Sequence, residues 1–501
     1  MARWICGAAA AALVAACVLG CGGGKSPHRE PGTTEPPPVT APPAAQPPVT
    51  SGAFRFYGPP QGVTGDVADV SADEGGNVWV AAGTHVLVRP AGARDFTALD
   101  LDAAGVSATC HDEAEVKVAA PASAARPCPA ISVAGLDAGR AIVGTRGVGT
   151  DGDDDATWAT RSGGADVLRL DALATPPRVE RVRHVLVAAP PGVACEEWDN
   201  SNPSVPRNTR CKDTWDGSIW ASGRLKLRQV QRIVVNHDRS RPLSYLDAYL
   251  GGTHASLAIL AAHPEDRGMA DTSKEDPEWT DTRGVWEHHH PDVWRGSSFL
   301  TGSAWGLALD PVSNVPWYTN GFRIASLQDY ASQRAPTAVG AWWGDQVPGG
   351  EHLWIWAREA DPADPARNDG SQALAFCPDG TLWVGSESHG LARVRLDRTR
   401  LEDLIAGYTI ERIPVPEGAG GALAVACDPA DGSVWVGFAW GGFGRWKDGW
   451  RTVPAQQDVP EFARGPVRSI QIDAGSTPRT VWMAHLASRL GPAGITAYDG
   501  P

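Results

Sequence analysis

Residues 373–385 decide the fold and read Ala-Leu-Ala-Phe-Cys-Pro-Asp-Gly-Thr-Leu-Trp-Val-Gly. An alternating apolar stretch comes first, an Asp-Gly turn follows at Asp379 and Gly380, and a second stretch is centred on Trp383. An Asp-Gly pair favours a tight reversal, because glycine readily takes the positive φ that such turns often need. The phrase therefore predicts two short antiparallel strands whose tryptophan packs against a neighbouring unit.

The same phrase recurs along the chain from residue 53 onwards. In the last four copies the tryptophans at 317, 383, 435 and 482 are 66, 52 and 47 residues apart, which matches four-stranded blades of about 40–50 residues with insertions. This spacing predicts an all-β chain folded as a β-propeller, with seven four-stranded blades; eight is the alternative if residues 182–187 begin another blade. The last copy lacks an outer strand, which we expect residues 54–57 to supply, closing the ring. The other copies begin at Val67, Ile131, Val230, Ser303, Ala422 and Val467.

One copy also carries a family resemblance. The phrase from Asp379 to Leu391, with Trp383, Gly385 and Gly390, is very similar to the repeat of two-component-regulator propellers. Those propellers form the periplasmic sensor domains of some hybrid histidine kinases. The resemblance covers about residues 53–501, is strongest in the last third, and implies a propeller that acts outside the cytoplasm. No transmembrane helix or kinase follows the repeats, so we do not expect direct signalling.

The N-terminus predicts export. Arg3 gives a positive start, residues 4–20 are apolar or small, and the run ends at Cys21. This pattern resembles the lipobox of bacterial lipoproteins, which implies a signal peptide over residues 1–20 and a lipid on Cys21, with Cys17 as the alternative. Gly22 after the cysteine further implies an outer-membrane lipoprotein in the cell envelope. Residues 21–52 are rich in proline and predict a disordered tether before a propeller over residues 53–501.

Charge and cysteine content narrow the class of partner. The chain has 58 acidic and 44 basic residues, a net charge of -14, so we expect no nucleic-acid partner. Without Cys6, Cys17 and Cys21, an even number of cysteines remains, which in an exported protein indicates disulfides. Their spacing suggests three pairs, Cys110–Cys128, Cys195–Cys211 and Cys377–Cys427. The last pair would join two adjacent blades. Zinc is the rival interpretation, but no Cys-x-x-Cys spacing occurs.

Several residues are candidates for a ligand or metal site. His85, His254 and His389 follow second strands and could face a ligand, although polar hairpin residues explain them as well. Trp440 lies in an aromatic segment that could stack on a sugar or pack between blades. The remaining candidates are histidines and aspartates, whose side chains can bind a metal ion, so calcium or another divalent cation is the only cofactor that the sequence suggests. Solvated loops would explain the same residues. These candidates are His288 and His290, followed by Asp151, Asp153 and Asp155.

The function predicted from these features is binding. No nucleophile elbow, phosphate loop or His-Glu-x-x-His motif is present, so catalysis has no named residues. Predicted loop insertions near residues 101–129, 190–215, 262–300 and 345–370 favour a non-catalytic binding or scaffolding module for a protein, peptide or glycan. The alternative is an extracytoplasmic hydrolase or lyase on a propeller scaffold, with a metal assisting.

Overall fold

The structure is a computed structural model. It describes residues 46–101, 103–104, 106, 109–110, 126–146, 164–185, 187–188, 225–226, 229–252, 257–263, 285–288, 304–319, 324–326, 351–353, 371–399, 408–451, 460–473, 479–489 and 491–500. Residues 45–501 form one compact unit. The predicted signal peptide, Cys17, Cys21 and most of the predicted tether lie outside the described residues. Within the part that is described, no helix is long and apolar enough to cross a bilayer.

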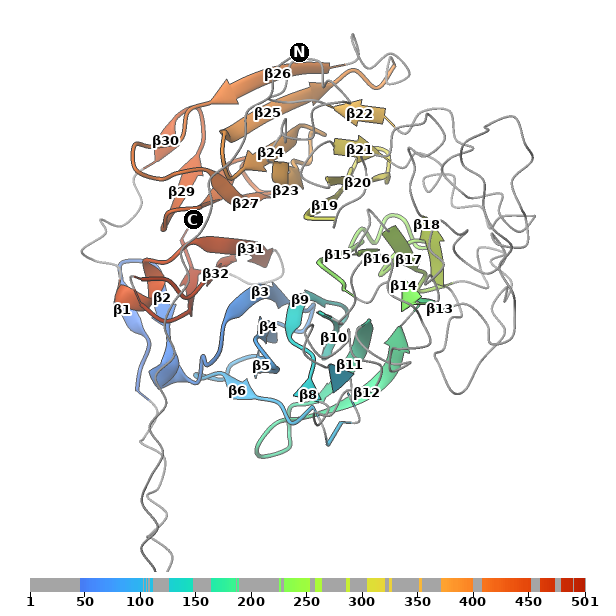
Figure 1. The fold of residues 1–501 in the computed structure, drawn as a ribbon, viewed down its shortest axis with the longest axis vertical. Helices are drawn as coiled ribbons and strands as arrows, with labels where there is room; N and C mark the ends of the chain where they lie inside the picture. Colours follow the sequence, from blue (N-terminus) through green and yellow to red (C-terminus); the bar gives the residue numbers. More distant parts are fainter. Residues whose placement is uncertain are drawn as a thin grey trace, which may run out of the picture. The chain divides into compact units, whose positions relative to one another are not determined.

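Most of the described residues belong to antiparallel sheets of four or five strands, which we number 1 to 7 in chain order (Figure 1). Sheet 1 contains β3 (Val67–Ala72), β4 (Val78–Ala82), β5 (His85–Arg89) and β6 (Thr97–Ala98). Sheet 2 contains β9 (Ala130–Gly135), β10 (Arg140–Thr145), β11 (Ala165–Asp171) and β12 (Arg178–Val185). Sheet 3 contains β15 (Arg232–Val235), β16 (Ala248–Gly251), β17 (Leu257–Leu260) and β18 (Val285–His288). Sheet 4 contains β19 (Gly306–Leu309), β20 (Pro316–Thr319), β21 (Ile324–Ser326) and β22 (Glu351–Leu353).

The remaining sheets come from the last third of the chain. Sheet 5 contains β23 (Ser371–Phe376), β24 (Leu382–Ser386), β25 (Gly390–Leu396) and β26 (Tyr408–Ile413). Sheet 6 contains β27 (Ala422–Cys427), β28 (Val434–Phe438), β29 (Phe443–Trp446) and β30 (Trp450–Arg451). Sheet 7 contains β31 (Val467–Asp473), β32 (Thr480–His485), β33 (Gly494–Tyr498), β2 (Phe54–Tyr57) and β1 (Val49–Ser51). Smaller elements are the pairs β7 (Thr109–Cys110) with β8 (Arg126–Pro127) and β13 (Val187–Ala188) with β14 (Leu225–Lys226), and the 3-10 helices η1 (Pro59–Gln61) and η8 (Glu461–Ala463).

The first strand of each sheet is its inner strand, and the inner strands form a closed ring. Each contacts the inner strand of the next sheet, and β31 of sheet 7 contacts β3 of sheet 1. Sheets arranged radially around such a ring are the blades of a β-propeller. The predicted all-β propeller is therefore confirmed. The described residues supply seven blades, and the blade number itself stays a prediction because long segments lie outside them.

Tryptophans fill the space between blades, as the sequence predicts. Trp79, Trp317, Trp435 and Trp482 are at most 2% exposed, and each lies in the second strand of its sheet. Trp79 packs with residues of sheet 2, and Trp482 packs with Val67 and Val70 of sheet 1. The turns also behave as expected, since Gly380 and Gly432 have φ values of 80° and 71°.

The ring closes at its outer edge through the N-terminal strand. β2 pairs antiparallel with β33, as expected for residues 54–57. The pairing then continues to β1, which lies inside the predicted tether over residues 21–52, so the end of that prediction is wrong. The Gln61 side-chain amide donates to the carbonyl oxygens of Gln46 and Pro47 at 3.2 and 3.0 Å, which holds this segment to the sheet. The proline-rich composition of this segment predicts disorder and gives no sign of its contacts with β2 and Gln61.

Outer strands account for the other corrections. Residues 182–187 do not begin an eighth blade, because residues 178–185 form β12, the outer strand of sheet 2. The predicted insertions near 262–300 and 345–370 each contain an outer strand, β18 and β22. An outer strand pairs with a neighbour on one edge only, and it does not need the alternating apolar pattern of the inner strands. The repeated phrase is therefore absent from outer strands.

Candidate functional site

A cavity of about 540 Å³ lies within the ring and is lined by residues from all seven inner strands. The turns between first and second strands, such as residues 377–381 and 428–433, lie at one end, which we call the turn end. Loops that join one sheet to the next, such as residues 414–421, lie at the opposite end, which we call the loop end. Much of the lining is apolar, and its charged residues are Asp69, Arg232, Asp238, Arg241 and Arg468.

Asp69 joins three inner strands at this cavity. The residue lies on β3 and is only 7% exposed. One carboxylate oxygen accepts hydrogen bonds from the Val70 amide at 3.0 Å and from the Ser469 hydroxyl on β31, and the other accepts from the Val133 amide on β9 at 2.9 Å. Burial raises the pKa of Asp69, while the charge of Arg232 and these hydrogen bonds oppose the rise.

Two arginines from the starts of different inner strands line the cavity at the loop end. Arg232 is the first residue of β15, and Arg468 is the second residue of β31. Arg232 donates through Nε to the Trp305 carbonyl at 2.8 Å and through Nη2 to the Arg468 carbonyl at 3.5 Å. Burial lowers the pKa of Arg468 to about 10, and the positive charges of Arg232 and Arg146 add to this effect, while Asp69 opposes it.

A long turn lines the turn end. Residues 236–247 connect β15 to β16 and contribute His237, Asp238 and Arg241 to the cavity wall. Glu74, in the first turn of sheet 1, accepts hydrogen bonds from the Tyr245 hydroxyl at 2.6 Å and contacts His237 Nδ1 at 3.2 Å. On the other side, Arg241 donates to the carbonyls of Pro311 and Val312 of sheet 4 at 3.0 and 2.9 Å. The turn is therefore fixed on both sides.

The contact between Glu74 and Tyr245 shifts the pKa of both side chains. Burial alone would raise the pKa of Glu74, but hydrogen bonds from Tyr245 and His237 and the charge of Arg239 lower it below its ordinary value. Burial and the same carboxylate raise the pKa of Tyr245 to about 12. Tyr245 therefore keeps its proton and donates to Glu74 across the whole neutral range.

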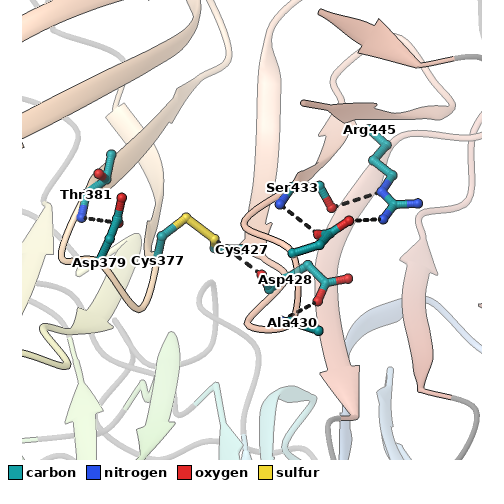
Figure 2. The surroundings of a disulfide bond; sticks show 9 residues. Cys377, Asp379, Thr381, Cys427, Asp428, Ala430, Ser433 and Arg445 are labelled. Atoms are coloured by element: carbon teal, nitrogen blue, oxygen red, sulfur yellow. Dashed lines mark hydrogen bonds and ion pairs between the residues drawn. A yellow bond between two sulfur atoms is a disulfide. The ribbon is translucent and has the colours of Figure 1, made fainter. Parts of the chain in front are cut away.

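Further bonds join adjacent blades at the turn end. Arg398 of sheet 5 donates through Nη2 to both oxygens of Asp310 of sheet 4 at 2.8 Å. The Cys377–Cys427 disulfide joins sheets 5 and 6 with its Cα atoms 5.2 Å apart, as the sequence predicts (Figure 2). Arg479 of sheet 7 pairs with Asp428 of sheet 6 at 2.6 Å. The turn end is thus a rigid, cross-linked rim.

The histidine and tryptophan candidates that the structure describes do not meet in this cavity. His85 is exposed at the start of β5, and His389 bonds to Ser386 and Ser388 in the turn before β25. Trp440 is 72% exposed. None of these three lines the cavity. His254 lies outside the described residues.

The metal candidates are not brought together by any described contact. Asp151, Asp153, Asp155 and His290 lie outside the described residues. His288 ends strand β18, where the sequence suggested a surface loop, and its backbone pairs with Leu257. Within the described residues, no group of three or more His, Cys, Asp or Glu side chains could hold a metal ion. Cys128 is disulfide-bonded, while Cys195, Cys211 and the Cys110 side chain lie outside what the structure describes.

Sequence reasoning missed the residues that do meet. Asp69, Arg232 and Arg468 all interrupt the apolar pattern of an inner-strand phrase, whereas the copy at 422–427 is apolar throughout. A charged residue inside a predicted inner strand was the sequence signal that could have identified these cavity residues. All the inner strands surround one cavity, so charged side chains on them can meet there even from sheets that are not adjacent, as Arg232 of sheet 3 and Arg468 of sheet 7 do.

Comparison with protein-family models and with curated proteins gives no match. Among solved structures, the extracellular domain of the hybrid two-component system BT3049 from B. thetaiotaomicron is 11% identical, with a TM-score of 0.46 over 89% of this chain. The chain spans 42% of that longer chain. YCF48 bound to D1 peptide is 9% identical, with a TM-score of 0.44 over 91% of this chain and 100% of the other. A chain of the Mitotic Checkpoint Complex is 10% identical, with a TM-score of 0.44 over 92% and 96% of the two chains. At such low similarity, the propeller assignment rests on the ring of sheets itself.

Proposed function

We propose that this chain is a lipid-anchored envelope propeller that binds a protein, peptide or glycan ligand without catalysis. The observation that supports this role is the cavity of about 540 Å³ with a lining from all seven inner strands. Cavities of this size suit a small molecule or a projecting part of a larger one. The similarity of residues 379–391 to two-component-regulator repeats supports a role in extracytoplasmic recognition.

The two ends of the cavity suit different roles. Ion pairs and a disulfide hold the turn end together. The described connections between sheets, such as residues 414–421, lie at the loop end, and in the sequence the predicted insertions near 101–129 and 190–215 also fall between one sheet and the next. Binding residues are often placed on loops that a rigid scaffold positions. We therefore propose that the ligand enters from the loop end.

The binding experiment uses the purified full chain on a glycan array and in a crosslinking pull-down from cell envelopes. Leu423→Trp is the test variant, because Leu423 lines the cavity with a half-buried side chain. Leu173→Trp is the matched control, because Leu173 is 95% exposed. We expect Leu423→Trp to lose the captured ligand while the control retains it, with similar melting temperatures. If neither method captures a ligand, or if both variants bind equally, this function is wrong.

The anchor is tested separately. We propose that the mature chain begins at Cys21, carries a lipid there, and resides in the outer membrane. Cys21→Ser should move the protein from the membrane fraction to the soluble fraction and abolish incorporation of a labelled fatty acid. Cys17→Ser is the control and should remain in the membrane. The reverse result would assign the lipid to Cys17.

A further inference from the structure

We propose that an oxyanion of the ligand, a carboxylate or a phosphate group, binds to Arg232 and Arg468 at the loop end of the cavity. The inference rests on the proposed binding function and names the charge of the group that is recognised. It depends on how these two arginines are placed and on which acidic groups are left to neutralise them.

Arg468 places a charged guanidinium in the cavity wall. Its half-buried side chain lines the cavity. No hydrogen bond or ion pair of its guanidinium is found among the described residues. Burial and the nearby charge of Arg232 both lower its pKa, yet at about 10 the group is still protonated at neutral pH. Charges removed from water are normally paired, so an unpaired guanidinium in a cavity wall indicates an external partner.

Arg232 is oriented by one hydrogen bond and, among the described residues, has further donors without a partner. Its Nε donates to the Trp305 carbonyl at 2.8 Å, which fixes the plane of the guanidinium. The contact of Nη2 with the Arg468 carbonyl is long, at 3.5 Å. An arginine held in this way presents its remaining N–H groups in a fixed fork, the geometry that suits carboxylate and phosphate oxygens.

Among the described residues, neither nearby carboxylate forms an ion pair with the two arginines. Asp69 already accepts hydrogen bonds from Val70, Val133 and Ser469 on its two oxygens. Glu387 acts on Arg468 only through its charge and accepts a hydrogen bond from Gln372 at 2.9 Å. Arg146 adds a third positive charge to the same region. Among the described residues, the guanidinium groups of Arg232 and Arg468 therefore have no carboxylate in direct contact.

The rest of the molecule makes this positive site selective. The chain has a net charge of -14, so its overall field repels free anions and does not concentrate them at the surface. An anion that binds must gain its affinity from local hydrogen bonds. The cavity volume of about 540 Å³ leaves room for a sugar acid or a phosphorylated small molecule rather than a bare ion alone.

The test uses three probes at millimolar concentration with the purified full chain: galacturonate, its neutral counterpart galactose, and inorganic phosphate. Affinity is measured by calorimetry and by the shift in melting temperature. We expect galacturonate or phosphate, but not galactose, to bind. Arg468→Gln should weaken that binding at least tenfold, and Arg232→Gln should act similarly. Binding of phosphate alone would assign the oxyanion to a phosphate, and binding of galacturonate alone to a carboxylate.

Arg395→Gln is the matched control, since Arg395 is an exposed residue of β25 outside the cavity lining, and it should bind like the unaltered chain. Arg468→Gln should also melt no lower than the unaltered chain without ligand, because it removes a partly buried charge whose guanidinium has no hydrogen-bond or ion-pair partner among the described residues. Equal affinity for galactose and galacturonate, no binding of either anion, or equal effects of Arg468→Gln and Arg395→Gln would overturn the inference. If the envelope pull-down still captures a cavity-dependent ligand in those cases, the proposed binding function stands without it.

Discussion

The carboxylate of Asp69 accepts a hydrogen bond from the hydroxyl of Ser469, a residue 400 positions later in the chain. Asp69 lies on the inner strand of sheet 1 and Ser469 on that of sheet 7. Since Asp69 also accepts from Val133 of sheet 2 at 2.9 Å, one buried side chain ties together the last, first and second blades. The ring is thus closed at its inner edge by a polar contact and at its outer edge by β2.

Removing the hydroxyl should destabilise the ring in a pH-dependent way. Because the folded pKa of Asp69 is raised, the folded state binds more protons than the unfolded state above the ordinary pKa of 3.8, and stability falls as pH rises through that interval. Ser469→Ala withdraws a donor from the charged form and raises the pKa further. We expect a loss of about 1–3 kcal/mol in the free energy of unfolding near pH 8 and a smaller loss near pH 4. Denaturant titrations at the two pH values measure it.

Ser71→Ala is the control for this change. The Ser71 hydroxyl oxygen accepts a hydrogen bond from the Gly135 amide at 2.9 Å, which likewise joins two inner strands, those of sheets 1 and 2, but no carboxylate is involved. Its loss should be the same at both pH values. An equal loss at both values for Ser469→Ala would show that the contact does not depend on the charge of Asp69.

The sequence predicted the parts of the fold that local patterns determine. Trp482 and the Asp379-Gly380 turn belong to phrases whose alternation and turn chemistry determine strands one and two of each blade. β18 and β22 were missed because outer strands need no such pattern. β1 was missed because a three-residue strand in proline-rich sequence owes its structure to β2 and Gln61, and no local propensity signals it.

The candidate site was harder to predict for a different reason. Asp69, Arg232 and Arg468 are far apart in the sequence and become neighbours only once the ring is closed. The histidines His85 and His389 shared a position in the repeat, but that position lies outside the cavity lining. Residues that share a position in the repeat are expected to lie at symmetric places around the ring. Such side chains are far from one another unless they lie near the central axis of the propeller.

The Arg398–Asp310 pair should contribute measurably to stability. The Asp310 side chain is 2% exposed, so Arg398→Gln leaves a buried carboxylate without its cation. We expect a loss of about 3 kcal/mol in the free energy of unfolding. Arg393→Gln is the control, because the side chain of its partner Glu411 is 50% exposed, and it should cost less than about 1 kcal/mol. Similar losses for the two variants would contradict the role of burial.

The disulfide between sheets 5 and 6 should stabilise the ring by restricting the unfolded chain. It closes a loop with a sequence separation of 50. For a loop of this length, chain entropy gives a stabilisation of up to about 4 kcal/mol. We expect the double variant Cys377→Ala, Cys427→Ala to unfold at a clearly lower denaturant concentration. A midpoint unchanged from that of the disulfide-bonded chain would show that the rim holds without this bond.

His485 should make the protein acid-sensitive. The residue is fully buried, its Nε2 lies 2.6 Å from the Thr496 hydroxyl oxygen, and burial lowers its pKa from 6.5 to about 4. Between these values the unfolded state binds the proton and the folded state does not, so stability rises with pH and is lost as pH falls from 6.5 towards 4. We expect about 2 kcal/mol less stability near pH 5 than near pH 8 from this group. His485→Gln should abolish that part of the pH dependence, while His389→Gln should retain it.

The N-terminal closing strand should be required for a monomeric propeller. Phe56 and Tyr57 are 0% and 1% exposed, and the Tyr57 ring packs edge-on against Phe96 with centroids 5.5 Å apart. A chain that starts at Gly58 loses these contacts and leaves the edge of β33 unpaired, a surface prone to pair with another chain. We expect it to melt at a lower temperature and to associate, as measured by calorimetry and light scattering.

A peptide of residues 46–57 added in trans should restore the monomer and raise the melting temperature, because it can pair with β33. The same peptide with Phe56→Asp should fail, since it would bury an unpaired carboxylate beside Ala463 and Phe462. A peptide with Thr50→Ala should work as well as the original, because Thr50 is exposed. A truncated chain that stays monomeric and equally stable without any peptide would show that the ring closes without this strand.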